Sequence, residues 1–225
     1  MRRAIEKHQL LEKNGRVLVG VSGGKDSYAL LYMLVYYNER YHQRWEIHAA
    51  HIDPQFPGWN PKPVKQFVEN LGLPFHYHRS LIAARIRDLG HRCFFCSRER
   101  RRRLLEIAEA NNIFTVALAH HQEDVGETLL LNMLYNGEIA VCLPRQSVIH
   151  GRFHFIRPLY YYSKDDILDL DRLRRFPRDV NSCPYGRDSR REKVRAILAE
   201  IHQHNRAVYK NLFGTLFNIK REYLP

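Results

Sequence analysis

The sequence predicts an α/β fold, in which a parallel twisted sheet of about five strands carries helices on both faces and is followed by C-terminal helices. Short apolar runs rich in β-branched residues alternate along the chain with segments of helical spacing, which is typical of a parallel sheet. The chain has 225 residues, 44% of them hydrophobic. That length and composition suit one substantial α/β domain with an appendage.

Each predicted strand is followed by a predicted helix. The strands are expected at Arg16–Val21, Trp45–Ile52, Phe75–His78, Phe114–Ala119 and Phe153–Ile156. The helices are expected at 27–38, 62–71, 97–111 and 124–136, and segment 143–154 is expected to be a loop. Because crossovers in such sheets are right-handed, the strand ends should meet at one edge, where functional side chains collect.

After residue 160 the alternation gives way to helical patterns alone. Ser163 is a candidate N-cap for the helix that follows it. The apolar residues of the tail recur at helical spacing and predict a packing surface: Val194, Ile197, Leu198, Ile201, Val208, Leu212 and Leu216. We therefore expect an α/β domain over residues 1–160 and a helical extension, packed on it, over residues 161–225.

The charge balance indicates an anionic partner. Lys and Arg number 36 against 24 Asp and Glu, which gives a formal charge of +12 and a pI near 9.7. A binder of polyanions needs such an excess, although a charge that only keeps the protein soluble is the alternative. The N-terminal stretch lacks an apolar h-region and no eighteen apolar residues run together, so we expect a cytoplasmic protein without membrane contact.

The stretch SGGKDS, which follows the first predicted strand, contains the parts of an anion site. It offers backbone N–H groups at two glycines, two hydroxyls and an ammonium group, from Gly23, Gly24, Ser22, Ser27 and Lys25. Asp26 would repel a bare polyphosphate, so its presence indicates a Mg²⁺ ion between the two. Neither the Walker spacing nor the dinucleotide Gly-x-Gly-x-x-Gly turn fits the stretch. An ordinary polar strand–turn–helix corner is the alternative.

Four cysteines suggest metal binding or catalysis before disulfides. Cys93 and Cys96 form a Cys-x-x-Cys pair directly before a predicted helix, and Cys183 is a distant third thiol. The pair fits a redox dithiol, half of a zinc site or part of an iron–sulfur cluster, and the spacing alone does not choose. Cys142 lies in the apolar stretch IAVCLP and is expected to pack as a small hydrophobic residue.

SGGKDS resembles the signature of the PP-loop ATP pyrophosphatase superfamily, whose fold is of the adenine nucleotide alpha-hydrolase type. The stretch TVALAHHQEDVGETLLLNM resembles the superfamily's motif after the fourth strand, with His120 and Asp124 aligned. Ala119 and Glu123 depart from its glycine and its first aspartate. The resemblance implies an enzyme that cleaves ATP between the α and β phosphates and adenylates a carbonyl oxygen.

The same resemblance implies the ATP site. ATP contacts are expected from Ser22, Gly23, Gly24, Lys25, Asp26, Ser27, Asp53 and His120, and catalytic roles from Lys25, Asp26 and Asp124. Two of these residues also have simpler interpretations. Asp124 at a helix start fits an N-cap, and Asp53 before Pro54 fits a turn.

A narrower resemblance covers nearly the whole chain, from about residue 16 to 218. CFFCSRERRRRLLEIA, FIRPLYYYSKDDI and FPRDVNSCPYGRDSRREKV resemble segments of the tRNA 2-thiocytidine synthetases. In that family three cysteines hold a [4Fe–4S] cluster with one iron left open for sulfur, and Cys93, Cys96 and Cys183 match them. Where many relatives have a second Cys-x-x-Cys-Gly, this chain has Cys183-Pro-Tyr-Gly. Zinc is the alternative occupant.

The resemblance implies an ATP- and iron–sulfur-dependent tRNA sulfurtransferase that adenylates O2 of a cytosine and replaces it with sulfur. Its expected requirements are ATP, Mg²⁺, the cluster, tRNA and a sulfur donor such as a cysteine desulfurase system. A tRNA 2-thiouridine synthetase of the same superfamily and a PP-loop protein with a non-RNA substrate are the alternatives. The sequence leaves the oligomeric state open, with a homodimer as one option.

A run of arginines follows the Cys-x-x-Cys pair. Spread over a helix, such a run points in several directions, so some members should approach an anion. Contacts to RNA or phosphate are expected from Arg98, Arg100, Arg101 and Arg157. A solvated helix face is the alternative for the run itself.

Overall fold

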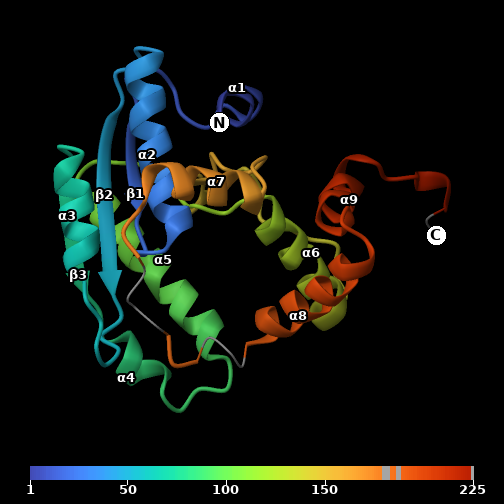
Figure 1. Ribbon diagram of the computed structural model, residues 1–225. Helices are drawn as coiled ribbons and strands as arrows, with labels where there is room; N and C mark the ends of the chain where they lie inside the picture. Colours follow the sequence, from blue (N-terminus) through green and yellow to red (C-terminus); the bar gives the residue numbers. More distant parts are fainter. Residues whose placement is uncertain (179–182, 186–188, 224–225) are drawn as a thin grey trace.

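The computed structural model describes residues 1–178, 183–185 and 189–223. Its centre is a six-stranded sheet of order β3-β2-β1-β4-β6-β5, in which every neighbouring pair is parallel except β5 and β6 (Figure 1). The strands are β1 (Arg16–Gly20), β2 (Glu46–Asp53), β3 (Phe75–Arg79), β4 (Thr115–Ala117), β5 (Arg145–Val148) and β6 (Phe153–Ile156). The predicted α/β fold with a mostly parallel sheet is confirmed.

Strand β5 corrects the expectation of a loop over 143–154. It pairs antiparallel with β6, with Arg145 opposite Ile156 and Val148 opposite Phe153. The hairpin between them turns through residues 149–151, all in the left-handed region. The sequence of β5, RQSV, has only one apolar residue, so its strand conformation comes from backbone pairing with β6 and carries no hydrophobic signal.

The described helices are α1 (Arg2–His8), α2 (Lys25–Arg40), α3 (Lys62–Asn70), α4 (Ile82–Ile86), α5 (Arg92–Ala110), α6 (Gln122–Asn136), α7 (Lys164–Arg174), α8 (Arg190–His204) and α9 (Val208–Gly214), with short 3₁₀ turns η2 (Thr215–Phe217) and η3 (Arg221–Tyr223). Helix α6 starts two residues earlier than expected, at Gln122, and two further helices also start early. Helix α2 already includes Lys25 and Asp26, and α5 includes both Cys93 and Cys96. Neither N-cap residue makes a side-chain capping bond, so the usual start signal is missing.

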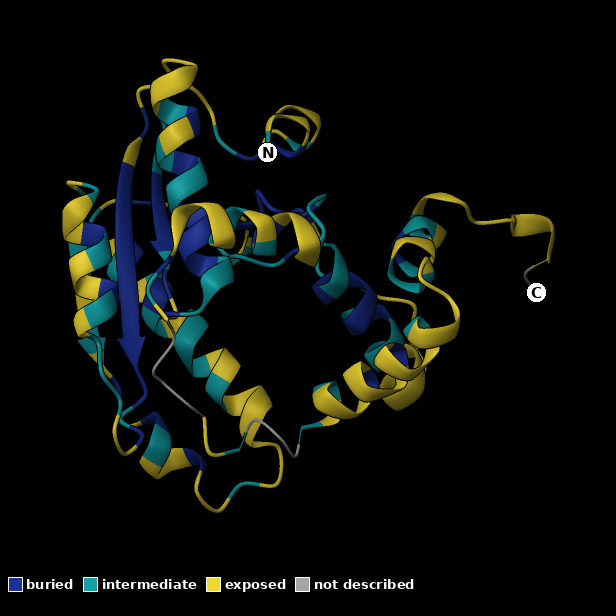
Figure 2. Ribbon diagram, in the orientation of Figure 1, coloured by how far each residue is buried: buried dark blue, intermediate teal, exposed yellow. Residues whose placement is uncertain are grey.

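Hydrophobic cores lie on both faces of the sheet. On one face Val17 and Val19 pack with α2 and α7, and on the other Leu18 packs with residues of α4 and α5 such as Ile82 and Leu104. The alternation follows from the two-residue period of a strand. In Figure 2 strands β1 and β2 are mostly dark blue, and the helices beside them are yellow on their outer surfaces. This packing fixes the edge of the sheet at which β1, β2 and β4 end.

The C-terminal helices form a second group. Ser163 is the N-cap of α7, as predicted, and its Oγ accepts a hydrogen bond from the Asp166 N–H at 3.2 Å. Helices α6, α8 and α9 pack against one another to one side of the sheet (Figure 1). The apolar stripe of the tail is narrower than expected, because Val194 is buried whereas Ile197 is 43% exposed. In the part of the chain that the structure describes, no helix has the length and apolarity needed to span a membrane.

Candidate active site

The loop between β1 and α2 is held in shape by its own residues. Gly23 has a φ of 98°, in the left-handed region that favours glycine. The Ser22 hydroxyl accepts a hydrogen bond from the Gly24 N–H at 3.3 Å, and the Ser27 hydroxyl donates to the Gly24 carbonyl at 2.7 Å. Helix α2 starts directly after this turn, so its positive end faces the loop. A glycine turn beside the start of a helix has the features that an anion site requires.

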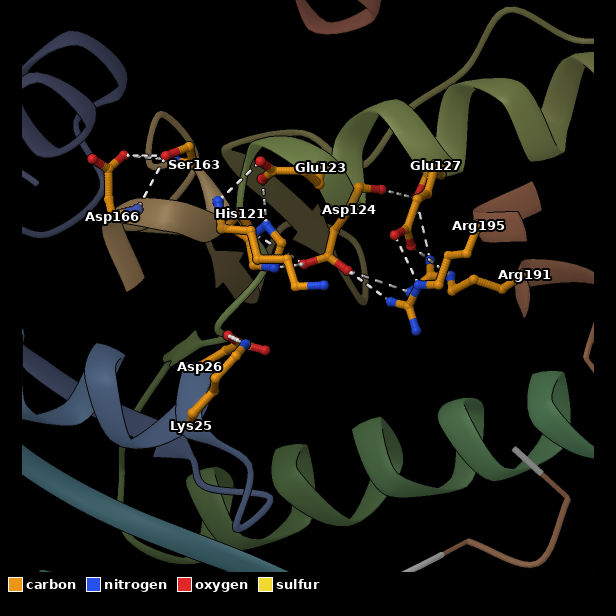
Figure 3. Close-up of polar contacts among 12 residues, drawn as sticks. Lys25, Asp26, His121, Glu123, Asp124, Glu127, Ser163, Asp166, Arg191 and Arg195 are labelled. Carbon is orange, nitrogen blue, oxygen red and sulfur yellow. Dashed lines mark hydrogen bonds and ion pairs between the residues drawn. The ribbon is translucent and has the colours of Figure 1, made fainter. Parts of the chain in front are cut away.

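Lys25 and Asp26 lie at the mouth of this loop. They form an ion pair with each other, and their side chains are 28% and 34% exposed. Figure 3 shows the pair across from His121 and Asp124 at the start of α6. The charge of Asp26 is near enough to help raise the pKa of His121. The phosphate-loop candidate and the predicted motif after β4 therefore face each other.

His120 is the first polar side chain after β4. Burial and, to a smaller extent, three nearby arginines lower its pKa to about 4, against the opposing charge of Asp124. These arginines are Arg157, Arg191 and Arg101. Its Nδ1 is buried and has no hydrogen-bond partner among the described residues. At neutral pH His120 is thus an uncharged ring with a free nitrogen inside an electropositive surrounding.

His121 and Asp124 cap helix α6. The N-cap is His121, so the interpretation of Asp124 as the N-cap is wrong; Asp124 is at position N3, where its Oδ2 accepts a hydrogen bond from the His121 N–H at 3.1 Å. His121 Nδ1 lies 2.8 Å from Glu123 Oε2. Burial lowers the pKa of His121, but the bond to Glu123 and the charge of Asp124 outweigh it and raise the pKa above its usual value. Glu123 at the family's aspartate position keeps a carboxylate bound to His121.

Two arginines of α8, which were not predicted from the sequence, form ion pairs with acidic residues of α6. Asp124 Oδ1 lies 3.8 Å from Arg191 Nη1 and 3.7 Å from Arg195 Nη2. Glu127, only 5% exposed, has its Oε1 2.8 Å from Arg195 Nε (Figure 3). The acids are three residues apart and the arginines four, so each pair lies on one helix face. That spacing was the available signal.

Burial raises the pKa of Asp124, whereas His121, His120 and Arg191 lower it, and the net result is a pKa below the usual value. Asp124 is therefore a carboxylate at neutral pH, although it is 8% exposed. Its surroundings keep a negative charge at the centre of the site. That is the protonation state needed for a metal-binding or phosphate-orienting role.

Asp53, expected to contact the nucleotide, is bound to protein groups. It is 5% exposed, and its Oδ2 accepts a hydrogen bond from the Tyr77 hydroxyl at 2.5 Å while its Oδ1 accepts one from the Gln55 N–H at 2.7 Å. Burial and the bond to Asp53 raise the pKa of Tyr77 to about 12. The turn interpretation of Asp53 therefore holds, and its contact with the nucleotide stays a prediction.

The three predicted cluster cysteines are neighbours. Cys93 and Cys96 lie in the first turns of α5, and burial raises the pKa of both thiols, with the charge of Cys183 raising each further. Ser189, which caps α8, hydrogen-bonds to Cys93. Two soft sulfur donors at the start of α5, with a third from a distant segment whose charge acts on both, are of the type that an iron–sulfur cluster takes. Within the described ranges, however, no three His, Cys, Asp or Glu side chains are close enough to hold a metal ion.

Cys142 lies apart from the other three cysteines. It packs against the cluster of Val125, Tyr160 and Phe213, as predicted for a small hydrophobic residue. Burial raises the pKa of its thiol, so it is protonated at neutral pH. Nothing in its surroundings assigns it to the cysteine trio.

The four arginines expected at RNA or phosphate divide into two pairs. Arg157 is 2% exposed and its Nη1 donates to the Leu143 carbonyl at 2.5 Å, whereas the Arg100 guanidinium lies 5.5 Å from the Trp59 ring centre. Arg98 and Arg101 line an open groove of about 540 Å³, and Arg101 is also near enough to His120 to lower its pKa. Arg157 is thus placed to act inside the site beside His120, and Arg98 on the surface.

Comparison with known proteins identifies the family. Residues 1–200 match the family model of the PP-loop domain. The chain belongs to the PP-loop family. It is 34% identical to a tRNA-cytidine(32) 2-sulfurtransferase from Geotalea uraniireducens over 228 aligned positions, which cover 99% of this chain and 90% of the relative. A protein of the same name from Burkholderia ambifaria is 31% identical, with 98% and 68% covered. The predicted family is confirmed.

Solved structures of other proteins share the fold. A U34-tRNA thiolase from Methanococcus maripaludis, solved with its [4Fe–4S] cluster, superposes with a TM-score of 0.73 at 21% identity, covering 100% of this chain and 78% of that one. An NH₃-dependent NAD synthetase from Campylobacter jejuni gives a TM-score of 0.52 at 18% identity, covering 99% and 90%. At such identities the likeness concerns the PP-loop fold alone.

Proposed function

We propose that this PP-loop protein is an ATP-dependent tRNA sulfurtransferase that converts a cytidine, at position 32 as in its named relatives, to 2-thiocytidine. The observation that carries the proposal is the presence, in one PP-loop chain, of a preformed phosphate loop and three neighbouring thiols. An adenylating site needs the first and a sulfur-transfer site the second. The relatives' name favours cytidine over the uridine alternative.

The loop Ser22–Ser27 binds the pyrophosphate part of ATP through backbone N–H groups and the start of α2. Lys25 exchanges its ion pair with Asp26 for phosphate oxygens, and Asp26 is then free to bind Mg²⁺. The free Nδ1 of neutral His120 contacts the nucleotide. Asp124 completes the acidic side of the site, which Mg²⁺ would share.

The target oxygen, O2 of the cytosine, attacks the α-phosphorus, and pyrophosphate leaves. Arg157, Arg191 and Arg101 surround His120 and stabilise the negative charge that develops on the phosphoryl oxygens. Cys93, Cys96 and Cys183 would hold a [4Fe–4S] cluster, which supplies, when bound, the sulfur that displaces AMP from C2. The original oxygen leaves with AMP, so the exchange of oxygen for sulfur needs no oxidant.

The rest of the chain serves tRNA binding and assembly. We propose that residues 1–160 form the ATP-binding domain, and that the extension 161–225 contributes Cys183 and the arginines of α8. The +12 charge binds the tRNA backbone in the cytoplasm, with an affinity that falls as salt rises. A cysteine desulfurase system is the proposed sulfur donor. A homodimer and a zinc-bound form both stay predictions.

The decisive test is mass analysis of tRNA nucleosides from a strain that lacks the gene. We expect 2-thiocytidine to disappear and to return with the wild-type gene but not with a Lys25→Ala variant. Loss of a thiouridine would instead favour the uridine enzyme. Pyrophosphate release by the purified protein that did not depend on tRNA would favour a non-RNA substrate.

A further inference from the structure

The open groove of about 540 Å³ runs along α5, on the side of the helix that faces strands β5 and β6. Helix α5 lines this α5 groove from Phe95 to Leu105, and the two strands contribute Val148 and Phe155. Because a helix rises about 1.5 Å per residue, the part of α5 that lines the groove is about 15 Å long. Phe155 is buried and Leu105 half-buried, so part of the lining is apolar. The α5 groove is therefore long enough for a short stretch of an extended chain.

The α5 groove carries an excess of positive charge. Its lining includes three arginines and, among the described residues, one carboxylate: Arg98, Arg101, Arg102 and Glu99. Glu99 Oε1 is already shared between arginines, at 2.7 Å from Arg102 Nη2 and 3.1 Å from Arg103 Nη2. Arg98, by contrast, is exposed and forms no ion pair within the described part of the chain. The side chains of the groove thus leave positive charge for an anionic partner.

Arg101 belongs both to the α5 groove and to the surroundings of the ATP site. It lines the groove, and its charge helps to lower the pKa of His120. Burial and the charge of Arg191 lower the pKa of Arg101 itself. Its Nη2 donates to Ser97 Oγ at 3.0 Å, and this bond orients the guanidinium. A chain that occupies the groove therefore passes directly beside the ATP site.

Phe95 contributes an exposed aromatic ring to the α5 groove. It is 38% exposed and lies between Cys93 and Cys96 in the first turns of α5. Its ring centre lies 5.6 Å from that of Phe94 in an edge-to-face pair. Arginines bind phosphates and an aromatic ring stacks on a base, so the combination suits a nucleic-acid strand. An acidic peptide would use the arginines but would leave this ring without a flat partner.

We propose that the α5 groove binds the RNA strand next to the target nucleotide, with phosphates on Arg98 and Arg101 and one base against Phe95. The inference rests on the proposed function, and only the neighbouring nucleotides occupy the groove. The target base lies beyond Arg101, at the ATP site. Because Arg101 is common to the groove and to the surroundings of His120, a strand in the groove presents its next base to that site. Unpaired bases of RNA loops are commonly held against aromatic side chains.

The test measures binding of the anaerobically purified whole protein to a labelled RNA stem-loop with the target cytidine in its loop. Fluorescence anisotropy at several salt concentrations gives the affinity and its salt slope. Arg98→Ala should weaken binding and lower the slope by about one, because one phosphate contact is lost. Phe95→Leu should weaken binding about 10-fold and leave the slope unchanged. Arg40→Ala is the matched control and should bind as the wild type does, since this exposed arginine ends α2, which packs on the opposite face of the sheet.

Opposite charges at one position separate the effect of charge from that of shape. Val148 lies on β5, lines the α5 groove and is half-buried. Val148→Glu should weaken RNA binding about 10-fold, because a carboxylate then faces the phosphates. Val148→Lys, a change of similar size, should bind the RNA at least as tightly as the wild type does. Damage to the edge strand would affect both variants alike, and their unfolding temperatures measure it.

Three results would overturn the inference, and they are distinguishable. If the wild-type protein binds and thiolates the RNA while Arg98→Ala and Val148→Glu keep its affinity and salt slope, the RNA lies on another face and the function stands. If these variants bind the RNA normally but lose thiolation only with a protein sulfur donor, the groove receives that protein instead. If the wild-type protein neither binds nor thiolates the RNA, the function itself fails and the inference with it. Iron content checks Phe95→Leu, and if that variant loses its iron the Arg98 and Val148 variants decide.

Discussion

The phosphate loop and the cysteine trio are built in opposite ways. The loop is made by six consecutive residues whose hydroxyls and glycines hold one another. The thiols come from the start of α5 and from a distant segment that packs through Tyr185 on Phe56 and ends at the N-cap of α8. A local site is formed before its ligand arrives, whereas a long-range one needs the ligand to draw its donors together. The two sites should therefore fail independently.

Replacing a cluster cysteine should give the largest effect. We expect Cys183→Ser to reduce tRNA thiolation on the order of 10³-fold or more, because one of three soft ligands is lost. ATP affinity should be unchanged, since the phosphate loop is self-contained. Iron content, the visible absorption of anaerobically purified protein and nucleoside analysis measure the result. Cys142→Ser is the control, and loss of the cluster in that variant would contradict the ligand assignment.

The reciprocal change is Lys25→Ala. It removes the positive charge from the loop, so we expect a fall in kcat/KM for ATP on the order of 10²–10³-fold. The iron content and absorption should stay as in the wild type. A variant that lost both nucleotide binding and cluster would show that the two sites are not independent.

Ion pairs between arginines of α8 and acidic residues of α6 connect the two sites. Arg195→Ala leaves Glu127, whose side chain is only 6% exposed, without its 2.8 Å partner. We expect the free energy of unfolding to fall by about 1–3 kcal/mol, measured by urea denaturation. Arg172→Ala removes a surface pair with Asp169, where both side chains are more than 70% exposed, and should cost less than about 1 kcal/mol. If both variants lost the same free energy of unfolding, the α6–α8 ion pairs would stabilise the protein no more than an exposed surface pair does.

The last prediction concerns pH. Burial lowers the pKa of His120 to about 4, so between its usual value of 6.5 and 4 the unfolded chain binds a proton that the folded chain does not. Its contribution to stability is therefore lost as pH falls through this window, by up to about 1.4 kcal/mol per pH unit. His120→Asn should flatten the fall, as followed by unfolding curves at several pH values. An unchanged pH slope would show that His120 is charged in the folded protein.

Local signals made the glycine turn after β1 and the N-cap Ser163 predictable. Both follow from a few neighbouring residues whose backbone preferences are strong. The starts of α2 and α5 were predicted too late, because Gly24 and His91 make no side-chain capping bond and the local signal is therefore missing. Where the chain gives no local signal, the position of a helix end depends on packing.

The missed residues of the site are those set by tertiary contacts. Glu127 and Arg195 come from helices far apart in the sequence, and only the packing of α8 on α6 shows that they pair. Arg157 was predicted at phosphate, but its burial depends on the turn after β6 and on the carbonyl of Leu143. The spacing within each helix shows which charges share a face, but a single sequence does not show which two helices meet.

The strand order also has a consequence for colloidal stability. The two edges of the sheet are β3 and β5, and an exposed edge can recruit a strand from another chain. Strand β3, FHYHR, is short and bears histidines and a terminal arginine, and β5 is a four-residue strand whose Arg145 is bound to the Gln9 carbonyl at 2.6 Å. Both edges thus carry the polar, short strands that oppose edge-to-edge aggregation. The protein should stay dispersed at the concentrations that anaerobic spectroscopy requires.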